Sequence, residues 1–164
     1  MTPADAKWLA VSRFLGRESL LLDEKDWDGW LGLYTEDAVY WVPAWDDRER
    51  LTADPNREIS LIYYPNRGGL EDRVFRIRTG RSSASTPGAR TSHMFTLLSV
   101  ADKGDLIQVR TSWSVTSVLE GAVTTYHGSA HYDLVPVGDS FQIQRKETII
   151  INDLAQTMLD VYSI

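Results

Sequence analysis

The period at which apolar residues recur changes near residue 90, and this change restricts the possible folds more than any other feature. In "LIQVRTSWSVTSVLE", residues 106–120, the apolar Ile107, Val109, Trp113 and Val115 share one face and polar residues the other. A two-residue period indicates a strand with one buried face. Three similar segments are separated from it by the turn signals "DKGD", "EGA" and "VGDS". They are "SHMFTLLSVAD", "AVTTYHGSAHYDLVPV" and "SFQIQRKETIII", which complete an antiparallel meander.

The N-terminal part has helical spacing instead. From Pro3 to about Lys25, apolar residues recur at three- and four-residue steps, with Thr2 as N-cap and Pro3 in the first turn. This predicts one long amphipathic helix. The next stretch, "DWDGWLGLYTED", predicts a short helix that begins after Asp26 and ends near Thr35. "AVYWVPAW" is rich in β-branched and aromatic residues, so a strand is expected there.

The segment that follows contains a Gly68-Gly69 break. "REISLIYY" before the break is expected to form one or two helical turns, and "GRSSASTPGAR" further on is expected to be a flexible loop. After the break, apolar residues again have helical spacing, with arginines on the solvent side. The expected buried residues of this helix are Leu70, Val74 and Ile77, and the expected solvent-facing ones are Arg73, Arg76 and Arg78.

Helices followed by an antiparallel meander are typical of an α+β domain. We therefore expect a single domain over residues 1–164, in which the N-terminal helices cover one face of a curved antiparallel sheet. A chain of 164 residues is long enough to bury a sizeable core without disulfides.

Composition excludes several classes of function. The chain has 17 basic and 23 acidic residues, a net charge of -6, which disfavours nucleic acid as a partner. It has no cysteine, which excludes disulfides, thiolate-bound zinc, a cysteine nucleophile and cysteine-ligated iron–sulfur clusters. No apolar run approaches the roughly 20 residues that span a bilayer, and no signal peptide is apparent. A cytoplasmic protein without a membrane partner is expected.

The histidines do not predict a metal site. His127 and His131 share one face of a predicted strand, but four strand residues span about 13 Å, too far for both rings to reach one ion. The alternative to a non-catalytic chain is a small pocket enzyme, an isomerase or dehydratase, with acid–base residues on the inner face of the sheet. Its candidates would be Tyr34, Asp37, Tyr40, His127 and Asp133.

Four stretches together carry a family resemblance. They are "ESLLLDEKDWDGW", "EDAVYWVPAWDD", "ISLIYYPNRGGLEDRVFRIRTGRSSA" and "RKETIIINDLAQTMLDVYSI". With them, the whole chain resembles the small, or beta, subunit of aromatic ring-hydroxylating dioxygenases. The resemblance is strongest to the benzoate branch, which includes the toluate, anthranilate and halobenzoate dioxygenases.

This resemblance implies a cone-like fold of the nuclear transport factor 2 type and assembly with a large, or alpha, subunit, as three copies of each around a homotrimer of this chain. In that family the large subunit carries a Rieske [2Fe-2S] cluster and a mononuclear iron, and NADH supplies electrons through a separate reductase. Those centres need cysteines and a two-histidine, one-carboxylate triad, which this chain cannot provide. The resemblance thus implies a structural subunit of an enzyme that cis-dihydroxylates benzoate or a related aromatic acid, with no catalytic, cofactor-binding or metal-binding residue in this chain.

A subunit interface is expected around the Gly68-Gly69 break. "PNRGG" predicts a sharp turn, and the arginines near it suit charge-paired contacts with another subunit, the alternative being a solvated helix face with internal ion pairs. Replacing Arg73 and Arg76 on that solvent side should change the free energy of unfolding by about 1 kcal/mol or less. A tryptophan outside regular structure is expected at an interface too. The candidate interface residues are Trp45, Arg67, Arg73, Arg76 and Arg78.

Overall fold

A computed structural model describes residues 1–46, 49–80, 88–152 and 159–164, and within them it contains three helices and six strands in one sheet. The order of the strands across the sheet is β2-β1-β6-β5-β4-β3. The elements are α1 (Pro3–Asp23), α2 (Trp27–Leu31), β1 (Tyr34–Pro43), β2 (Ser60–Tyr64), α3 (Arg67–Arg78), β3 (Arg90–Asp102), β4 (Ile107–Leu119), β5 (Ala122–Val137) and β6 (Ser140–Ile150).

The predicted meander is confirmed, because β3, β4, β5 and β6 pair successively in antiparallel fashion. The sheet as a whole is mixed, however. β1 pairs with β2 antiparallel but runs parallel to β6, so the expectation of a purely antiparallel sheet was incomplete. The α+β class is confirmed.

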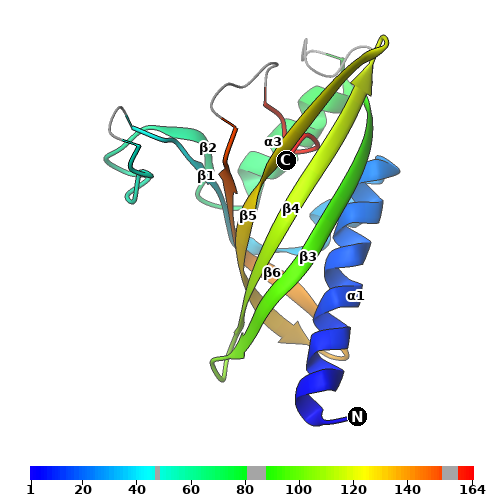
Figure 1. Ribbon diagram of the computed structural model, residues 1–164, viewed down its shortest axis with the longest axis vertical. Coiled ribbons are helices and arrows are strands. Elements are labelled where there is room, and N and C mark those ends of the chain that lie inside the picture. The colour runs from blue at the N-terminus through cyan, green and yellow to red at the C-terminus, as the bar shows by residue number, and fades with distance from the viewer. Residues whose placement is uncertain (47–48, 81–87, 153–158) are drawn as a thin grey trace.

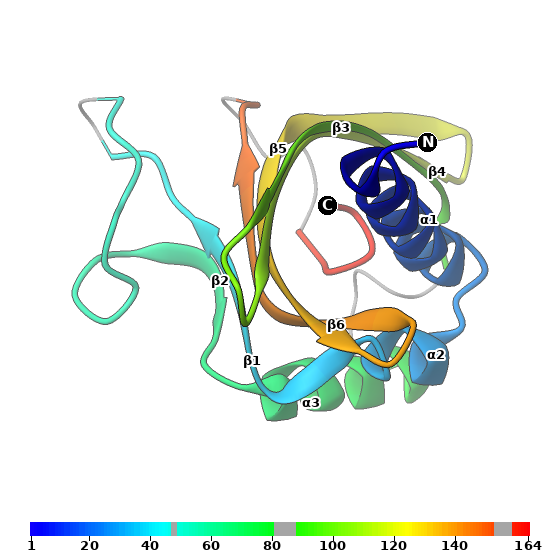
Figure 2. The ribbon, with the colours of Figure 1, turned by 90° about the horizontal axis from the view of Figure 1, so that it is seen from below.

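The sheet curls into a cone around α1, as seen along the strands in Figure 2. Bulges interrupt the pairing between Leu97 and Ser99 on β3 and between Asp133 and Leu134 on β5. A bulge increases the local twist of a strand, and such irregularities bend a sheet. α1 packs against β3 and β6, and α3 packs against β1 and β2 (Figures 1 and 2).

The start of α1 follows from three residues. The hydroxyl of Thr2 accepts a hydrogen bond from the amide of Asp5 (3.1 Å), and the Asp5 carboxylate accepts one from the amide of Thr2 (2.8 Å). This reciprocal pair is a capping box, and Pro3 in the first turn has no amide proton to lose. The predicted first helix is confirmed, ending at Asp23.

Two local predictions were wrong. The second helix ends at Leu31, and Tyr34 begins β1 instead of continuing the helix. Residues 60–64 form strand β2, where helical turns were expected, because Tyr63 and Tyr64 pair with Trp41 and Tyr40 of β1. The predicted loop "GRSSASTPGAR" lies mostly outside the described residues.

The last described segment, residues 159–164, lies inside the cone, where Figure 2 shows it enclosed by the sheet and α1. Its residues from Asp160 to Ile164 are all buried. They join the apolar core formed by α1, α2, α3 and the inner face of the sheet. Among the described residues, no helix is long and apolar enough to cross a membrane.

Candidate functional site

The cone interior contains a buried polar network centred on Glu18 of α1. Its carboxylate accepts hydrogen bonds from Tyr34 Oη (2.8 Å), Tyr132 Oη (3.0 Å) and Lys146 Nζ (3.0 Å). The four residues come from α1, β1, β5 and β6, so the network ties the helix to three strands. A buried ion pair of this kind is stable only when hydrogen bonds satisfy its remaining lone pairs.

Burial and charge shift the acidity of these groups. Burial opposes ionisation of Glu18, but the charge of Lys146 and the donated hydrogen bonds outweigh it and lower the pKa of Glu18. Burial, followed by the negative charge of Glu18, raises the pKa of Tyr34 and of Tyr132 well above 10.0. The tyrosines are therefore fixed donors at neutral pH, and the carboxylate a fixed acceptor.

A second polar pair lies at the edge of the network, where β3 faces α1. His93 Nδ1 is 2.5 Å from Asp23 Oδ1, and the His93 amide donates to the same carboxylate (3.1 Å). Burial lowers the pKa of His93 despite this neighbouring acid. The neutral ring is therefore favoured at pH 7, in which Nδ1 acts as the donor to Asp23.

The cavity beside Glu18 is too small for an aromatic substrate. Its volume is about 30 Å³, and Glu18, His93 and Ile164 are among the residues that line it. A water molecule takes up roughly 30 Å³ of liquid, whereas small-molecule sites usually measure roughly 300–1,000 Å³. Buried side chains of the segment 159–164 pack into the cone beside this cavity, and a separate cavity of about 210 Å³ lies where Leu22, Trp27 and Tyr162 meet.

The candidates of the pocket-enzyme alternative do not form one site. Tyr34 and Tyr40 are buried in the cone, whereas Asp37 and His127 are exposed and Asp133 is half-buried on the outer side of β5. Asp37 bonds to the hydroxyl of Thr35 (2.7 Å), a local contact. No group of three or more His, Asp or Glu side chains within the described ranges is placed to hold a metal ion.

Three of the four candidate arginines on α3 contact their own chain. Arg67 donates to Glu71 Oε1 (2.9 Å) and to the carbonyl of Tyr34 (3.1 Å). Arg78 pairs with Asp28 of α2 (2.8 Å). Arg76 is exposed and makes no ion pair with any described residue. Arg76 is thus the arginine of α3 with most freedom to meet another subunit.

The expected position of Arg73 was wrong. Its side chain is 15% exposed, and its guanidinium binds both carboxylate oxygens of Asp160, whose side chain is fully buried. The contact between Nε and Oδ1 measures 2.7 Å. Arg73 therefore holds the segment 159–164 in the cone, and replacing it will disturb the fold.

Trp45 lies at the base of a projecting arm, which we define as residues 44–46 and 49–59 (Figure 1). The indole Nε1 donates to the carbonyl of Ile150 on β6 (2.7 Å), yet 47% of the residue stays exposed. Trp45 also forms a single bridge with Leu51. The bridge to Leu51 fixes the backbone of Trp45 and the bond to Ile150 fixes its indole N–H, while the apolar face of the ring is exposed to solvent.

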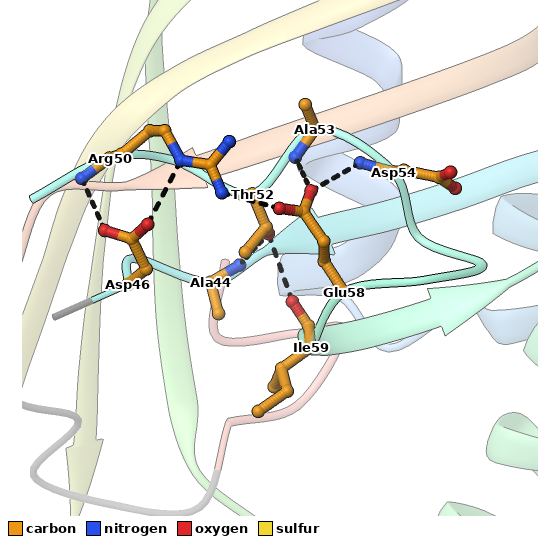
Figure 3. Close-up of polar contacts among 8 residues, drawn as sticks. All are labelled: Ala44, Asp46, Arg50, Thr52, Ala53, Asp54, Glu58 and Ile59. Atoms are coloured by element: carbon orange, nitrogen blue, oxygen red, sulfur yellow. Dashed lines mark hydrogen bonds and ion pairs between the residues drawn. The ribbon is translucent and has the colours of Figure 1, made fainter. Parts of the chain in front are cut away.

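Polar contacts within the arm fix its shape, as Figure 3 shows. Arg50 binds Asp46 through Nε (3.1 Å) and Glu58 through Nη2 (2.7 Å). The other oxygen of Glu58 accepts from the amides of Ala53 (2.6 Å) and Asp54 (2.9 Å), which lowers the pKa of Glu58. The arm is thus internally ordered although it projects from the sheet.

The Thr52 hydroxyl fastens the base of this arm. It accepts a hydrogen bond from the amide of Ala44 (3.1 Å) and donates one to the carbonyl of Ile59 (3.1 Å), so both ends of the arm are tied together (Figure 3). Thr52 is 7% exposed, and burial protects these bonds from competition by water.

A model of one protein family, described as "Ring hydroxylating beta subunit", matches residues 17–157. The chain belongs to this family. This beta subunit is 43% identical over 156 residues to the toluate 1,2-dioxygenase subunit beta of Pseudomonas putida, a match that covers 94% of this chain and 96% of that protein. The family resemblance drawn from the sequence is confirmed.

Solved structures agree on the fold of this beta subunit. The crystal structure of the beta subunit of benzoate 1,2-dioxygenase from Burkholderia mallei ATCC 23344 is 46% identical, with a TM-score of 0.75 and coverage of 94% of this chain and 95% of that chain. An NTF2-like protein with a cystatin-like fold from Novosphingobium aromaticivorans is 16% identical, with a TM-score of 0.62 and coverage of 90% and 83%. The second match concerns the fold alone, and it confirms the nuclear transport factor 2 type. The toluate and benzoate dioxygenase subunits favour a dioxygenase subunit over the pocket-enzyme alternative.

Sequence reasoning missed the buried network, although one signal for it was present. Glu18 lies on the apolar stripe of α1, at helical spacing between Leu15 and Leu22. A charged residue in such a stripe requires a buried partner. No pattern around Lys146 identifies it as that partner, because the two residues are 128 positions apart.

Proposed function

We propose that this beta subunit supports the assembly of an aromatic ring-hydroxylating dioxygenase and contributes no catalytic residue to it. The observation that carries the proposal is the small volume left beside the buried polar groups: the cavity at Glu18 holds about 30 Å³, and the buried segment 159–164 packs into the cone next to it. In this proposal residues 1–164 form one domain whose outer surfaces are its functional part.

The complex is proposed to act in the cytoplasm and to cis-dihydroxylate benzoate or a closely related aromatic acid. The names of two relatives support this class of substrate, because they are subunits of toluate and benzoate 1,2-dioxygenases at 43% and 46% identity. Such similar identities do not separate one aromatic acid from another. Benzoate is our first choice.

The redox centres are assigned to the partner. A Rieske [2Fe-2S] cluster requires two cysteines and two histidines, and a non-haem iron site requires two histidines and a carboxylate. This chain has no cysteine and three histidines, and one of these, His93, is hydrogen-bonded to Asp23 through Nδ1. Its residues do not fit either centre. The large subunit would carry both, with NADH as electron source through a separate reductase.

The proposed assembly contains three large and three small subunits, with the small subunits forming a trimer. Support comes from the ordered arm at Trp45 and from Arg76, the α3 arginine that has no ion pair within the described chain. The side chains of Arg67 and Arg78 are partly exposed, so both stay candidates for the subunit interface. Arg73 forms an ion pair with the buried Asp160 instead.

Co-purification with the cognate large subunit tests this function. We expect a complex of defined mass by light scattering, and turnover of benzoate, toluate or anthranilate only when the large subunit and reductase are present. The chain alone should contain no stoichiometric iron by metal analysis. Turnover by the chain alone, or a complex that forms and works equally well without it, would refute the proposal.

A matched pair of variants separates catalysis from assembly. His127→Ala changes an exposed residue of β5, and Tyr40→Phe removes a buried hydroxyl of β1. With complex yield unchanged, turnover should stay within about twofold of wild type. A loss of two to four decades in turnover at normal yield is the size expected for a general acid or base, and it would restore the pocket-enzyme alternative.

A further inference from the structure

Large apolar side chains are exposed where the arm joins the sheet. Trp45 is 47% exposed, Ile59 78% and Leu61 47%. Exposed apolar patches of this kind on soluble proteins often mark binding surfaces. Trp45 and Leu61 also line a cleft of about 180 Å³, which we call the arm cleft. Its other lining residues are Ala44, Tyr126, Ile150, Asn152 and Leu159.

The arm cleft matches one aromatic side chain in size. An apolar cavity of roughly 150 Å³ accepts a benzene ring. The walls are mainly aliphatic and aromatic, and the indole nitrogen of Trp45 is already bonded to the carbonyl of Ile150. The chemistry of the cleft therefore favours an uncharged ring.

A free aromatic ring is available on α3 of the same chain. Phe75 is 57% exposed, while Leu70 and Val74 of the same helix are buried in the core. No residue of α3 is among the described residues that line the arm cleft. α3 packs along β1 and β2, whereas the arm leaves the ends of these strands and projects away from the cone (Figures 1 and 2). Because no described residue of α3 lines the arm cleft of its own chain, the exposed Phe75 is available for the arm cleft of another copy.

The charges of the two surfaces are complementary. The described part of the arm has four acidic side chains and two arginines, Arg50 and Arg57, whereas α3 has four arginines and two acidic side chains, Glu71 and Asp72. Arg76, next to Phe75, has no ion pair among the described residues, and neither has Glu49 of the arm. Opposite potentials on two surfaces steer encounter and fix orientation.

We propose that Phe75 of one copy inserts into the arm cleft of a second copy, with Arg76 facing the acidic arm. The occupant of the cleft is thus a second copy of this chain. Because two different surfaces meet, the contact is heterologous, and its repetition closes a ring when the rotation per copy allows. The inference rests on the proposed function, since it names the surface through which this beta subunit associates with itself.

Cysteine cross-linking of the full chain tests the contact directly. The sequence has no cysteine, so an introduced cysteine is the only thiol in each protein that can react with the cross-linker. Asp72→Cys, which places a thiol on α3 one turn before Phe75 and keeps the Phe75 ring, and Leu61→Cys are prepared as separate proteins and treated with a short bis-maleimide. A cross-linked dimer should form when the two proteins are mixed and should be absent from each protein alone. Dimers in the single proteins would indicate a symmetric contact, and no dimer in the mixture would exclude this one; either result overturns the proposal.

Light scattering of Phe75→Ala provides a second measurement that does not depend on cross-linking. Loss of a central aromatic side chain should weaken self-association roughly tenfold or more. Leu20→Ala is the matched control, because Leu20 is 54% exposed on α1 and lies in neither surface. Unchanged melting curves establish that both variants are folded.

The large subunit is the competing occupant. If Phe75→Ala self-associates normally but no longer binds the large subunit, the surface belongs to the large subunit and the inference is wrong. A third outcome is that the wild-type chain assembles with the large subunit but its self-association does not depend on Phe75. In that case the proposed function stands and the proposed Phe75 interface is wrong. Weakened self-association of Phe75→Ala, with the control unchanged, supports the inference.

Discussion

Replacing Arg73 by alanine should destabilise the isolated chain strongly, although the residue lies on the helix face that the sequence marks as polar. In the structure Arg73 makes two hydrogen bonds to the carboxylate of Asp160. Asp160 is fully buried at its side chain, and the amide of Val161 also donates to it (2.8 Å). Without Arg73, a buried carboxylate would lose its cationic partner.

The size of the effect follows from the burial of the two groups. Removing one partner of a buried ion pair typically costs about 3–5 kcal/mol. Arg73 retains 15% exposure, so water reaches part of the pair, and we expect the lower end, about 3 kcal/mol. In a domain of this length each kcal/mol changes the melting temperature by about 2–4 °C. The expected decrease is therefore roughly 6–12 °C.

Thermal unfolding followed by circular dichroism measures this decrease. Arg76→Ala is the matched control, because Arg76 is exposed on the same helix and should change the free energy by about 0.5 kcal/mol or less. Combining Arg73→Ala with Asp160→Asn should recover about 1 kcal/mol or more relative to the sum of the single effects. If Arg73→Ala and Arg76→Ala melt within 2 °C of each other, about the smallest difference that 1 kcal/mol would produce, the assigned role of the ion pair is wrong.

Two further predictions concern the interior of the cone. The pKa of Glu18 is lowered on folding, so its stabilisation is present above its unfolded value of about 4.5 and is lost as the pH falls through the folded value. Glu18→Gln should accordingly have a lower free energy of unfolding than wild type at pH 7. Between pH 7 and a pH below 4.5, urea unfolding should show a smaller decrease in this free energy for Glu18→Gln than for wild type, and equal decreases would contradict this. Gly128→Ala places a Cβ 1.8 Å from the carbonyl oxygen of Ile149 and should cost at least about 2 kcal/mol in the same assay. Gly16→Ala, with nothing within 4 Å, should be neutral or stabilising, and a comparable loss in both glycine variants would show that the close approach is not the cause.

Local chemistry was sufficient to predict much of the secondary structure. The capping box at Thr2 and the two-residue period from Arg90 to Ile150 depend on neighbours a few positions apart, so both are visible in the sequence. Residues 60–64 show the limit of such reasoning. Their strand exists because β1 offers an edge to pair with, and that edge is not encoded next to them.

The family could be identified from the sequence because long, specific stretches of it resemble that family, whereas the interior of the cone could not be predicted. Composition was enough to exclude a cysteine-ligated iron–sulfur cluster from this chain, since it has no cysteine. The small volume left beside Glu18 depends on residues 159–164 folding back into the cone (Figure 2). Nothing in a short apolar segment specifies whether it lies inside its own fold or against another subunit.

The sequence by itself determined the amphipathic helix of α1, the meander and the absence of thiolate chemistry, because each depends on residue type and local spacing. Tertiary structure alone decided the partners of Glu18 and Arg73. Lys146 lies 128 positions from Glu18, and Asp160 lies 87 positions from Arg73. A charged side chain such as Arg73, which looks solvent-facing in its own helix, becomes internal when a distant segment closes over it, and removing one member of such a pair then leaves the other buried without its partner.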